Sequence, residues 1–176
     1  MVKHAVILVD PPWRYDFEAS GSREIENQYP TMELDEIKKM NIETEDNAVL
    51  FLWATAPKLI EALEVMKAWG FTYKTHLIWD KEIIGMGYWF RGQHELLLVG
   101  TKGNFSPPDE TMRVSSVIRS RRREHSRKPD VIRTLISKWY PNSTKIEIFA
   151  RQHFEGWDVY GNEVPTGVQK TLCQQN

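Results

Sequence analysis

The segment VDPPWRY, residues 9–15, brings together groups that can act on a planar base with an exocyclic amine. The carboxylate of Asp10 and the carbonyl of Pro11 can accept the two amine hydrogens, while the indole of Trp13 stacks on the ring or contacts its edge. Such an amine is a poor nucleophile because its lone pair is delocalised into the ring. Two acceptors held rigidly by Pro11 and Pro12 favour its attack on an activated methyl donor, which indicates S-adenosylmethionine as the cofactor.

The position of this motif distinguishes it from an ordinary loop, in which an acid before proline commonly opens a turn. The residues before it, Ala5 to Leu8, are apolar and branched, as in a buried strand. The two prolines must end that strand because proline supplies no backbone donor to a sheet. Asp10 is therefore expected at the carboxyl edge of a strand.

Other catalytic chemistries have little support in the composition. Cys173 is the single cysteine and lies in a polar tail, so the sequence offers neither a disulfide framework nor a thiolate metal cluster. The five histidines have no partner at metal-ligand spacing, and no phosphate-binding loop is recognisable. We therefore expect no metal.

Strand patterns alternate with helix patterns along the chain. Strands are expected at 5–8, 46–55, 73–81, 96–103, 144–150 and 156–162, and helices at 33–40, 56–71 and 128–141. The polar stretch 18–32 and the glycine-punctuated aromatic stretch 85–95 read as long loops. This alternation predicts an α/β layered sheet, in which ligands gather beyond the carboxyl ends of the strands.

The composition predicts one soluble domain. At 176 residues and 41% hydrophobic, without an internal linker, the chain is expected to form a single domain over residues 1–165 with a polar tail at 166–176. No apolar run approaches the roughly 18 residues of a membrane span, and the N-terminus lacks a cleavage signal. We expect a cytoplasmic protein of a bacterium or a phage-infected cell, without membrane partners.

Charge is segregated although the net charge is only -1. Seven basic residues stand against one acid between Arg113 and Lys128, next to the expected active-site turn. Such a run suits contacts with phosphates, and a solvated charged loop is the alternative.

Seven ordered motifs resemble a known family. DPPW is followed by YPTM, FLWAT, WGF, HSRKPD, IEIFAR and GWDVYGNE, a series that resembles the MT-A family of S-adenosylmethionine-dependent N6-adenine methyltransferases in its compact bacterial and phage form. The resemblance extends from about Val6 to Val164. It implies a Rossmann-like class I methyltransferase sheet flanked by helices, with a permuted motif order in which the catalytic strand comes first.

The resemblance also implies site residues. The catalytic motif corresponds to Asp10, Pro11, Pro12 and Trp13. Positions that bind S-adenosylmethionine correspond to Asp10, Lys128, Arg151, His153, Asn162 and Glu163. Among them, Lys128 is expected to pair with the cofactor's carboxylate and Asn162 to hold its ribose.

Expected substrate-binding residues have three origins. Glu95 falls where the family has an acid close to the substrate base, although a solvated loop glutamate is the alternative. Exposed aromatics can cushion a base flipped from a duplex, and arginines can contact phosphates. The set comprises Tyr15, Tyr29, Glu95, Arg119, Arg121, Arg122 and Arg123, with Tyr88 and Trp89 as further aromatic candidates.

Two departures from the family concern the cofactor. Only nine residues precede Asp10, whereas family members usually carry upstream residues that clasp the cofactor's adenine. Phe154 stands after His153, where larger relatives have an amide. The sequence therefore leaves open how the adenine moiety is held.

The expected activity is methyl transfer to the N6 amine of adenine in nucleic acid. DNA is favoured over RNA because the compact, stand-alone form is more similar to bacterial and phage members, which act mainly on DNA. The alternatives are an RNA methyltransferase, a non-catalytic nucleic-acid-binding subunit, an enzyme acting on another amine, and an α/β binding module without cofactor. A homodimer or a second subunit is also compatible with the exposed aromatics.

Overall fold

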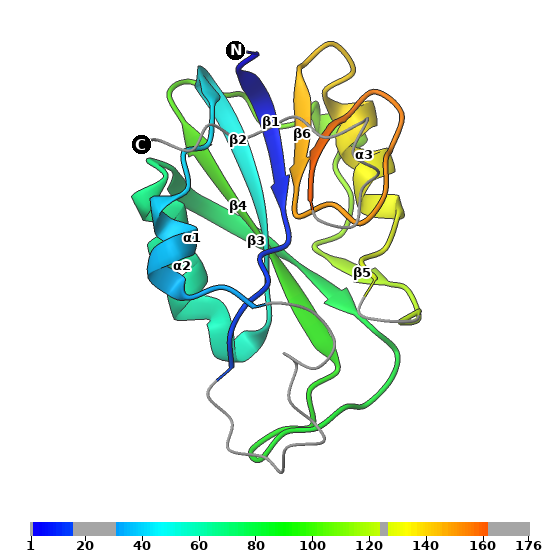
Figure 1. Ribbon diagram of the computed structural model, residues 1–176. Helices are drawn as coiled ribbons and strands as arrows, with labels where there is room; N and C mark the ends of the chain where they lie inside the picture. The colour runs from blue at the N-terminus through cyan, green and yellow to red at the C-terminus, as the bar shows by residue number, and fades with distance from the viewer. Residues whose placement is uncertain (1, 16–30, 124–126, 162–176) are drawn as a thin grey trace.

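The computed structural model describes residues 2–15, 31–123 and 127–161, which form a seven-stranded sheet flanked by helices (Figure 1). The strands are β1 (His4–Val9), β2 (Thr44–Ala54), β3 (Thr72–Asp80), β4 (His94–Lys102), β5 (Val117–Arg119), β6 (Lys145–Ile148) and β7 (Asp158–Tyr160). The helices are α1 (Leu34–Lys39), α2 (Leu59–Ala68) and α3 (Val131–Trp139), with short 3-10 turns η2 (Ala56–Lys58) and η3 (Glu110–Met112).

The strand order, β5-β3-β4-β2-β1-β6-β7, places β1 in the interior of the sheet. Val9 at the end of β1 pairs with Leu52 of β2 on one side and with Ile148 of β6 on the other. Among the described strands only β4 runs antiparallel to its neighbours. The chain leaves β1 through α1 to reach β2, and it reaches β6 through α3 on the opposite face, so the carboxyl end of β1 is a topological switch point.

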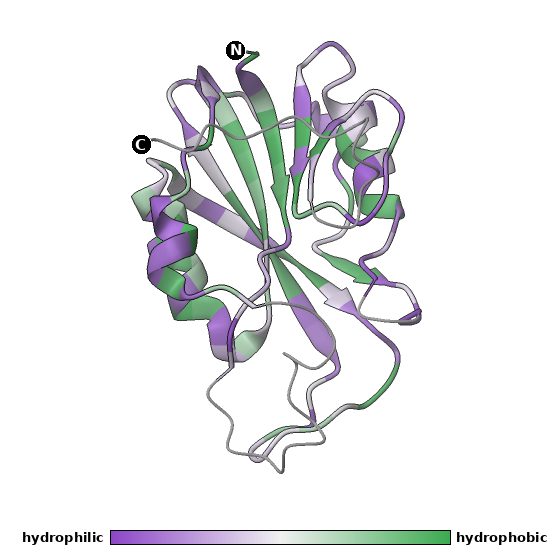
Figure 2. Ribbon diagram, in the orientation of Figure 1, coloured by the Kyte–Doolittle hydropathy of each residue, from purple (hydrophilic) through white to green (hydrophobic). Residues whose placement is uncertain are grey.

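Alternating side chains of the central strands form two core layers. Ile7 and Leu50 belong to a cluster with α1 and α2, whereas Val6 and Leu8 belong to a cluster with Ile132 of α3. Figure 2 shows the resulting hydrophobic colour along the central strands, with hydrophilic residues at the outer surface of α1 and α2. Both faces of the central sheet are therefore covered, as its continuous apolar runs require.

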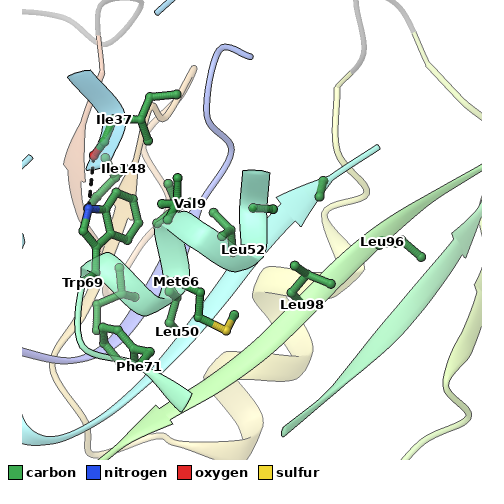
Figure 3. Close-up of a cluster of buried hydrophobic side chains, with 14 of the residues drawn as sticks. Val9, Ile37, Leu50, Leu52, Met66, Trp69, Phe71, Leu96, Leu98 and Ile148 are labelled. Carbon is green, nitrogen blue, oxygen red and sulfur yellow. Dashed lines mark hydrogen bonds between the residues drawn. The ribbon is translucent and has the colours of Figure 1, made fainter. Parts of the chain in front are cut away.

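Trp69 connects the two helices on one face. In Figure 3 its indole lies beside Ile37, and its Nε1 donates a hydrogen bond of 3.1 Å to the Ile37 carbonyl. Met66 and Phe71 pack in the same cluster beneath it. Gly70 follows with a φ of 81°, a left-handed conformation that ends the α2 segment at little steric cost.

Each predicted strand and helix is confirmed, although the bounds differ, and the structure has one additional strand. β4 begins at His94, so Glu95 lies inside a strand and not in the aromatic loop. The strand β5, which pairs with the end of β3, was not predicted. No helix among the described residues is long and apolar enough to cross a membrane.

Candidate active site

The DPPW motif forms a fixed turn at the carboxyl end of β1. The Asp10 amide still bonds the Ile148 carbonyl of β6, at 3.4 Å. The Pro11 carbonyl accepts the Trp13 amide at 2.9 Å, and the Pro12 carbonyl accepts the Met32 amide at 2.9 Å. The turn therefore holds Asp10 just beyond the sheet, with Pro11 buried beneath it.

Trp13 is largely buried. It is 6% exposed, belongs to the core cluster of α1 and α2, and donates from Nε1 to the Trp53 carbonyl at 3.2 Å. This bond attaches the turn after β1 to the end of β2. Trp13 therefore positions the motif, and its stacking on a base stays a prediction.

Asp10, Lys128 and Glu95 form one ionic cluster beside this turn. The Lys128 ammonium lies 2.9 Å from Asp10 Oδ1 and 3.1 Å from Glu95 Oε2. It also lies 5.5 Å from the centre of the Trp53 ring, within the range of a cation–π contact. The Asp10 side chain is 25% exposed and that of Lys128 13%, so Asp10 is the more exposed side chain of the pair.

The electrostatics of the cluster depend on burial and on this pairing. Burial raises the pKa of Asp10 above its ordinary value, and the nearby Glu95 adds to this, while the charge of Lys128 opposes it. Burial alone would lower the pKa of Lys128, but the charges of Asp10 and Glu95 raise it well above its ordinary value. Lys128 is thus a permanent cation beside two carboxylates, and its charge limits the rise in the pKa of Asp10.

A second charged cluster fixes the segment that carries Lys128. Arg133 of α3 makes a bidentate pair with Glu147 of β6, at 2.7 and 2.6 Å, and its Nη1 bonds Asp130 at 3.1 Å. Asp130 also accepts from Arg123 at 2.8 Å. Although partial burial raises the pKa of Asp130, its arginine partners lower it below the ordinary value. These bonds attach the start of α3 to the sheet directly after Lys128.

Two further predicted cofactor-binding residues, Arg151 and His153, follow β6 in the chain. Arg151 follows β6, and its charge weakly lowers the pKa of Asp10. His153 is exposed two residues later. Phe149, between β6 and Arg151, has a φ of 62°, an uncommon conformation for a bulky residue that turns the chain at the sheet edge. Their binding to the cofactor stays a prediction.

Predicted substrate-binding residues fall into three groups. Glu95 is buried within β4 and joined to Asp10 through Lys128, so it is not a solvated loop residue. The Tyr15 hydroxyl lies 2.7 Å from the Thr55 hydroxyl, at the end of β2. Tyr29 lies outside the described residues, as do the predicted cofactor-binding residues Asn162 and Glu163 and the expected tail 166–176.

The predicted arginines line the edge of the sheet next to β3. Arg119, Arg121, Arg122 and Arg123 are all exposed. Arg119 lies 3.6 Å from Asp80, and the Arg122 amide donates to the Lys81 carbonyl at 3.1 Å. The guanidinium groups of Arg121 and Arg122 have no ion pair with any residue that the structure describes. Their contact with phosphates stays a prediction.

Lys81 is a further charged residue of the site that was not predicted. Its ammonium lies 3.3 Å from Glu95 Oε1, which makes it the second cation on that carboxylate. The signal was present, because Lys81 is the last residue of the expected strand 73–81 and so lies at a strand end, as Asp10 does. No group of three or more potential metal ligands occurs among the described residues.

Comparison with known proteins gives a consistent result. The model of the MT-A70 family matches residues 4–163. The chain is 33% identical over 183 residues to the type II methyltransferase M.MunI of Mycoplasma sp., with 93% of this chain and 78% of the relative covered. It is 32% identical over 173 residues to the human N(6)-adenosine-methyltransferase catalytic subunit METTL3, covering 92% of this chain and 28% of that protein. A putative N(6)-adenosine-methyltransferase MT-A70-like protein of Medicago truncatula is 33% identical, and the chain spans 26% of its length.

Proposed function

The chain belongs to the MT-A70 family and is an S-adenosylmethionine-dependent N6-adenine methyltransferase, and we propose that the adenine it methylates lies in DNA. The preference for DNA is supported by the extent of the similarity to the bacterial type II methyltransferase, of which the chain spans 78%, against about a quarter of the eukaryotic relatives. The observation that carries the catalytic proposal is the Asp10–Lys128–Glu95 cluster at the switch point of the sheet.

Asp10 and Pro11 orient the amine in this proposal. Lys128 engages Oδ1 of Asp10, which leaves Oδ2 to accept one hydrogen of the adenine amine. The Pro11 carbonyl oxygen has two lone pairs, and the Trp13 amide uses one of them. The other lone pair accepts the second hydrogen of the adenine amine. The amine nitrogen would then present its lone pair to the methyl group: the N–C bond would form as the sulfur–methyl bond of the donor breaks, leaving a thioether, and one N–H proton would pass through Oδ2 of Asp10 to solvent. S-adenosylmethionine supplies the methyl group when bound.

The charges of the site fit the methionine end of that cofactor. This end is a zwitterion, with an ammonium and a carboxylate on one carbon. Asp10 and Lys128 present opposite charges 2.9 Å apart, so a zwitterion beside them meets a counter-charge for each of its groups. Lys128, Arg151 and His153 are the proposed contacts for the carboxylate end, with Asn162 and Glu163 at the ribose.

The proposal is tested by methyl transfer from labelled S-adenosylmethionine. The acceptors are double-stranded DNA, single-stranded DNA and RNA of matched sequence, each digested to nucleosides afterwards. N6-methyladenine in a DNA pool supports the proposal. N6-methyladenosine in the RNA pool alone overturns the choice of DNA. Cofactor binding without product in any pool favours a non-catalytic subunit or another amine.

The exposed arginines are expected to contact phosphates. Reversing Arg121 and Arg122 to glutamate should weaken DNA binding about tenfold or more at low salt and reduce the slope of log affinity against log salt by about two. The measurement is fluorescence anisotropy with one duplex over a salt series. The matched control reverses Lys3 and Lys74, two exposed lysines toward the amino edge of the sheet. An unchanged slope for the arginine variant would show that these arginines are solvated and do not contact phosphates.

A further inference from the structure

The loop between β3 and β4, residues 81–93, carries the most exposed aromatic side chains among the described residues. Tyr88 is 97% exposed, Trp89 94% and Phe90 89%, and Ile84 and Met86 beside them are also exposed. These three consecutive aromatic side chains are exposed to solvent and do not belong to the hydrophobic core. A contiguous exposed apolar patch of this kind marks a binding surface.

The backbone holds these side chains away from the domain. The Gly85 amide donates to the Gly92 carbonyl at 2.8 Å, and the Gly92 amide donates to the Met86 carbonyl at 3.0 Å, which closes residues 85–92 into a tight loop. A Cβ at Gly87 would overlap the Phe90 carbonyl oxygen, so the turn requires glycine there. The aromatics therefore stand at the tip of an ordered turn.

Both ends of the loop are attached to the active site. At its start, the Lys81 ammonium bonds Glu95 at 3.3 Å. At its end, the Gln93 amide bonds Asp80, and Glu95 follows two residues later with its contact to Lys128. In Figure 1 the loop projects beyond the carboxyl ends of the strands, on the side of the sheet where β1 ends. The loop therefore lies on the same side of the sheet as the Asp10–Lys128–Glu95 cluster.

The charge beside the aromatics indicates the chemistry of the occupant. Arg91 belongs to the loop, and the Arg121–Arg122 segment runs along its start through the bond from the Arg122 amide to Lys81. Cationic guanidinium groups next to exposed aromatic rings suit a polyanion with flat apolar faces, which is single-stranded nucleic acid.

We propose that Tyr88, Trp89 and Phe90 form a stacking platform for unpaired bases that flank the target adenine. The inference rests on the proposed function and extends it, because it assigns recognition of the neighbouring nucleotides to the β3–β4 loop. Stacking is tolerant of base identity, so the platform favours opened or single-stranded flanks over one sequence.

The test compares two labelled single-stranded DNA oligonucleotides that contain one adenine. In the first the flanking nucleotides are thymidines, and in the second they are abasic. Replacing Trp89 and Phe90 by alanine should weaken binding of the first about tenfold or more, measured by anisotropy, and leave binding of the second unchanged. Trp89→Phe should retain most of the affinity. The control is Ile60→Ala, which removes an exposed apolar side chain from α2.

Three results would overturn the platform. The first is equal affinity of the wild type and the alanine variant for the first oligonucleotide. The second is an equal loss of affinity for both oligonucleotides in the variant. The third is a wild-type protein that sediments as a dimer while the alanine variant sediments as a monomer. Methyl transfer to the best acceptor from the assay above is measured on the same samples. Flank-dependent binding without methyl transfer contradicts the proposed function and leaves the platform in place, whereas methyl transfer without flank dependence contradicts the platform alone.

Discussion

Asp10→Asn is expected to lower the rate of methyl transfer about a thousandfold, with a much smaller loss of S-adenosylmethionine binding because Lys128 and the other proposed cofactor contacts remain. The amide keeps the shape of the carboxylate but loses its charge, and its NH2 group is a donor that faces the donor hydrogens of adenine. Loss of one preorganised group that stabilises the developing charge typically costs a factor of 10² to 10³, and the mismatched donor adds to that. Lys128 keeps Glu95 as a partner in this variant, so the site should stay folded.

The measurement is single-turnover methyl transfer at saturating cofactor, with cofactor affinity determined separately by calorimetry. Asp46→Asn is the matched control because Asp46 is an exposed aspartate near the amino end of β2, away from the site. Activity of Asp10→Asn within tenfold of the wild type would show that the carboxylate does not orient the amine. A large loss of cofactor binding would make Asp10 a cofactor ligand first.

Much of the fold could be predicted because its signals are local. Continuous apolar runs such as the one in β2 mark strands covered on both faces, and Pro129 and Pro141 bracket α3. The strand β5 gave no such signal. It is an edge strand of three residues whose side chains are at least partly exposed. It forms because the edge of β3 is open for pairing. Three residues are too few to show a period.

The contents of the site were predicted better than their contacts. The switch-point rule placed Asp10 at a strand end, and the family resemblance selected Lys128 and Glu95. The pairing of one ammonium with both carboxylates could not be predicted. It depends on how three elements distant in sequence lie in space, namely β1, β4 and the segment before α3, and no local sequence pattern shows their separation. The burial of Trp13 was missed for a related reason, since its hydrogen bond goes to the Trp53 backbone of a neighbouring strand.

Lys128→Met should reduce methyl transfer at neutral pH about a hundredfold and move the acid limb of the pH–rate profile to higher pH. Burial and the charge of Glu95 already raise the pKa of Asp10, and the variant removes the cation that opposes both. Asp10 then retains its proton to higher pH, and a protonated carboxyl is a poorer acceptor for the amine. Lys128→Arg should keep the acid limb near that of the wild type, because the positive charge remains.

Stability and rescue decide whether Lys128 acts through Asp10 or only through the cofactor. Because the folded pKa of Asp10 lies above its unfolded value, ionising it destabilises the fold, and this cost grows as pH rises through that interval. Lys128→Met should therefore lose more stability at pH 8 than at pH 5, by as much as ~3 to 5 kcal/mol at the higher pH for a broken buried pair. Adding Glu95→Gln removes the like charge and should return the acid limb toward lower pH. A raised KM for S-adenosylmethionine with an unmoved acid limb would instead restrict Lys128 to holding the cofactor, since a ligand contact alone leaves the ionisation of Asp10 in the free enzyme unchanged.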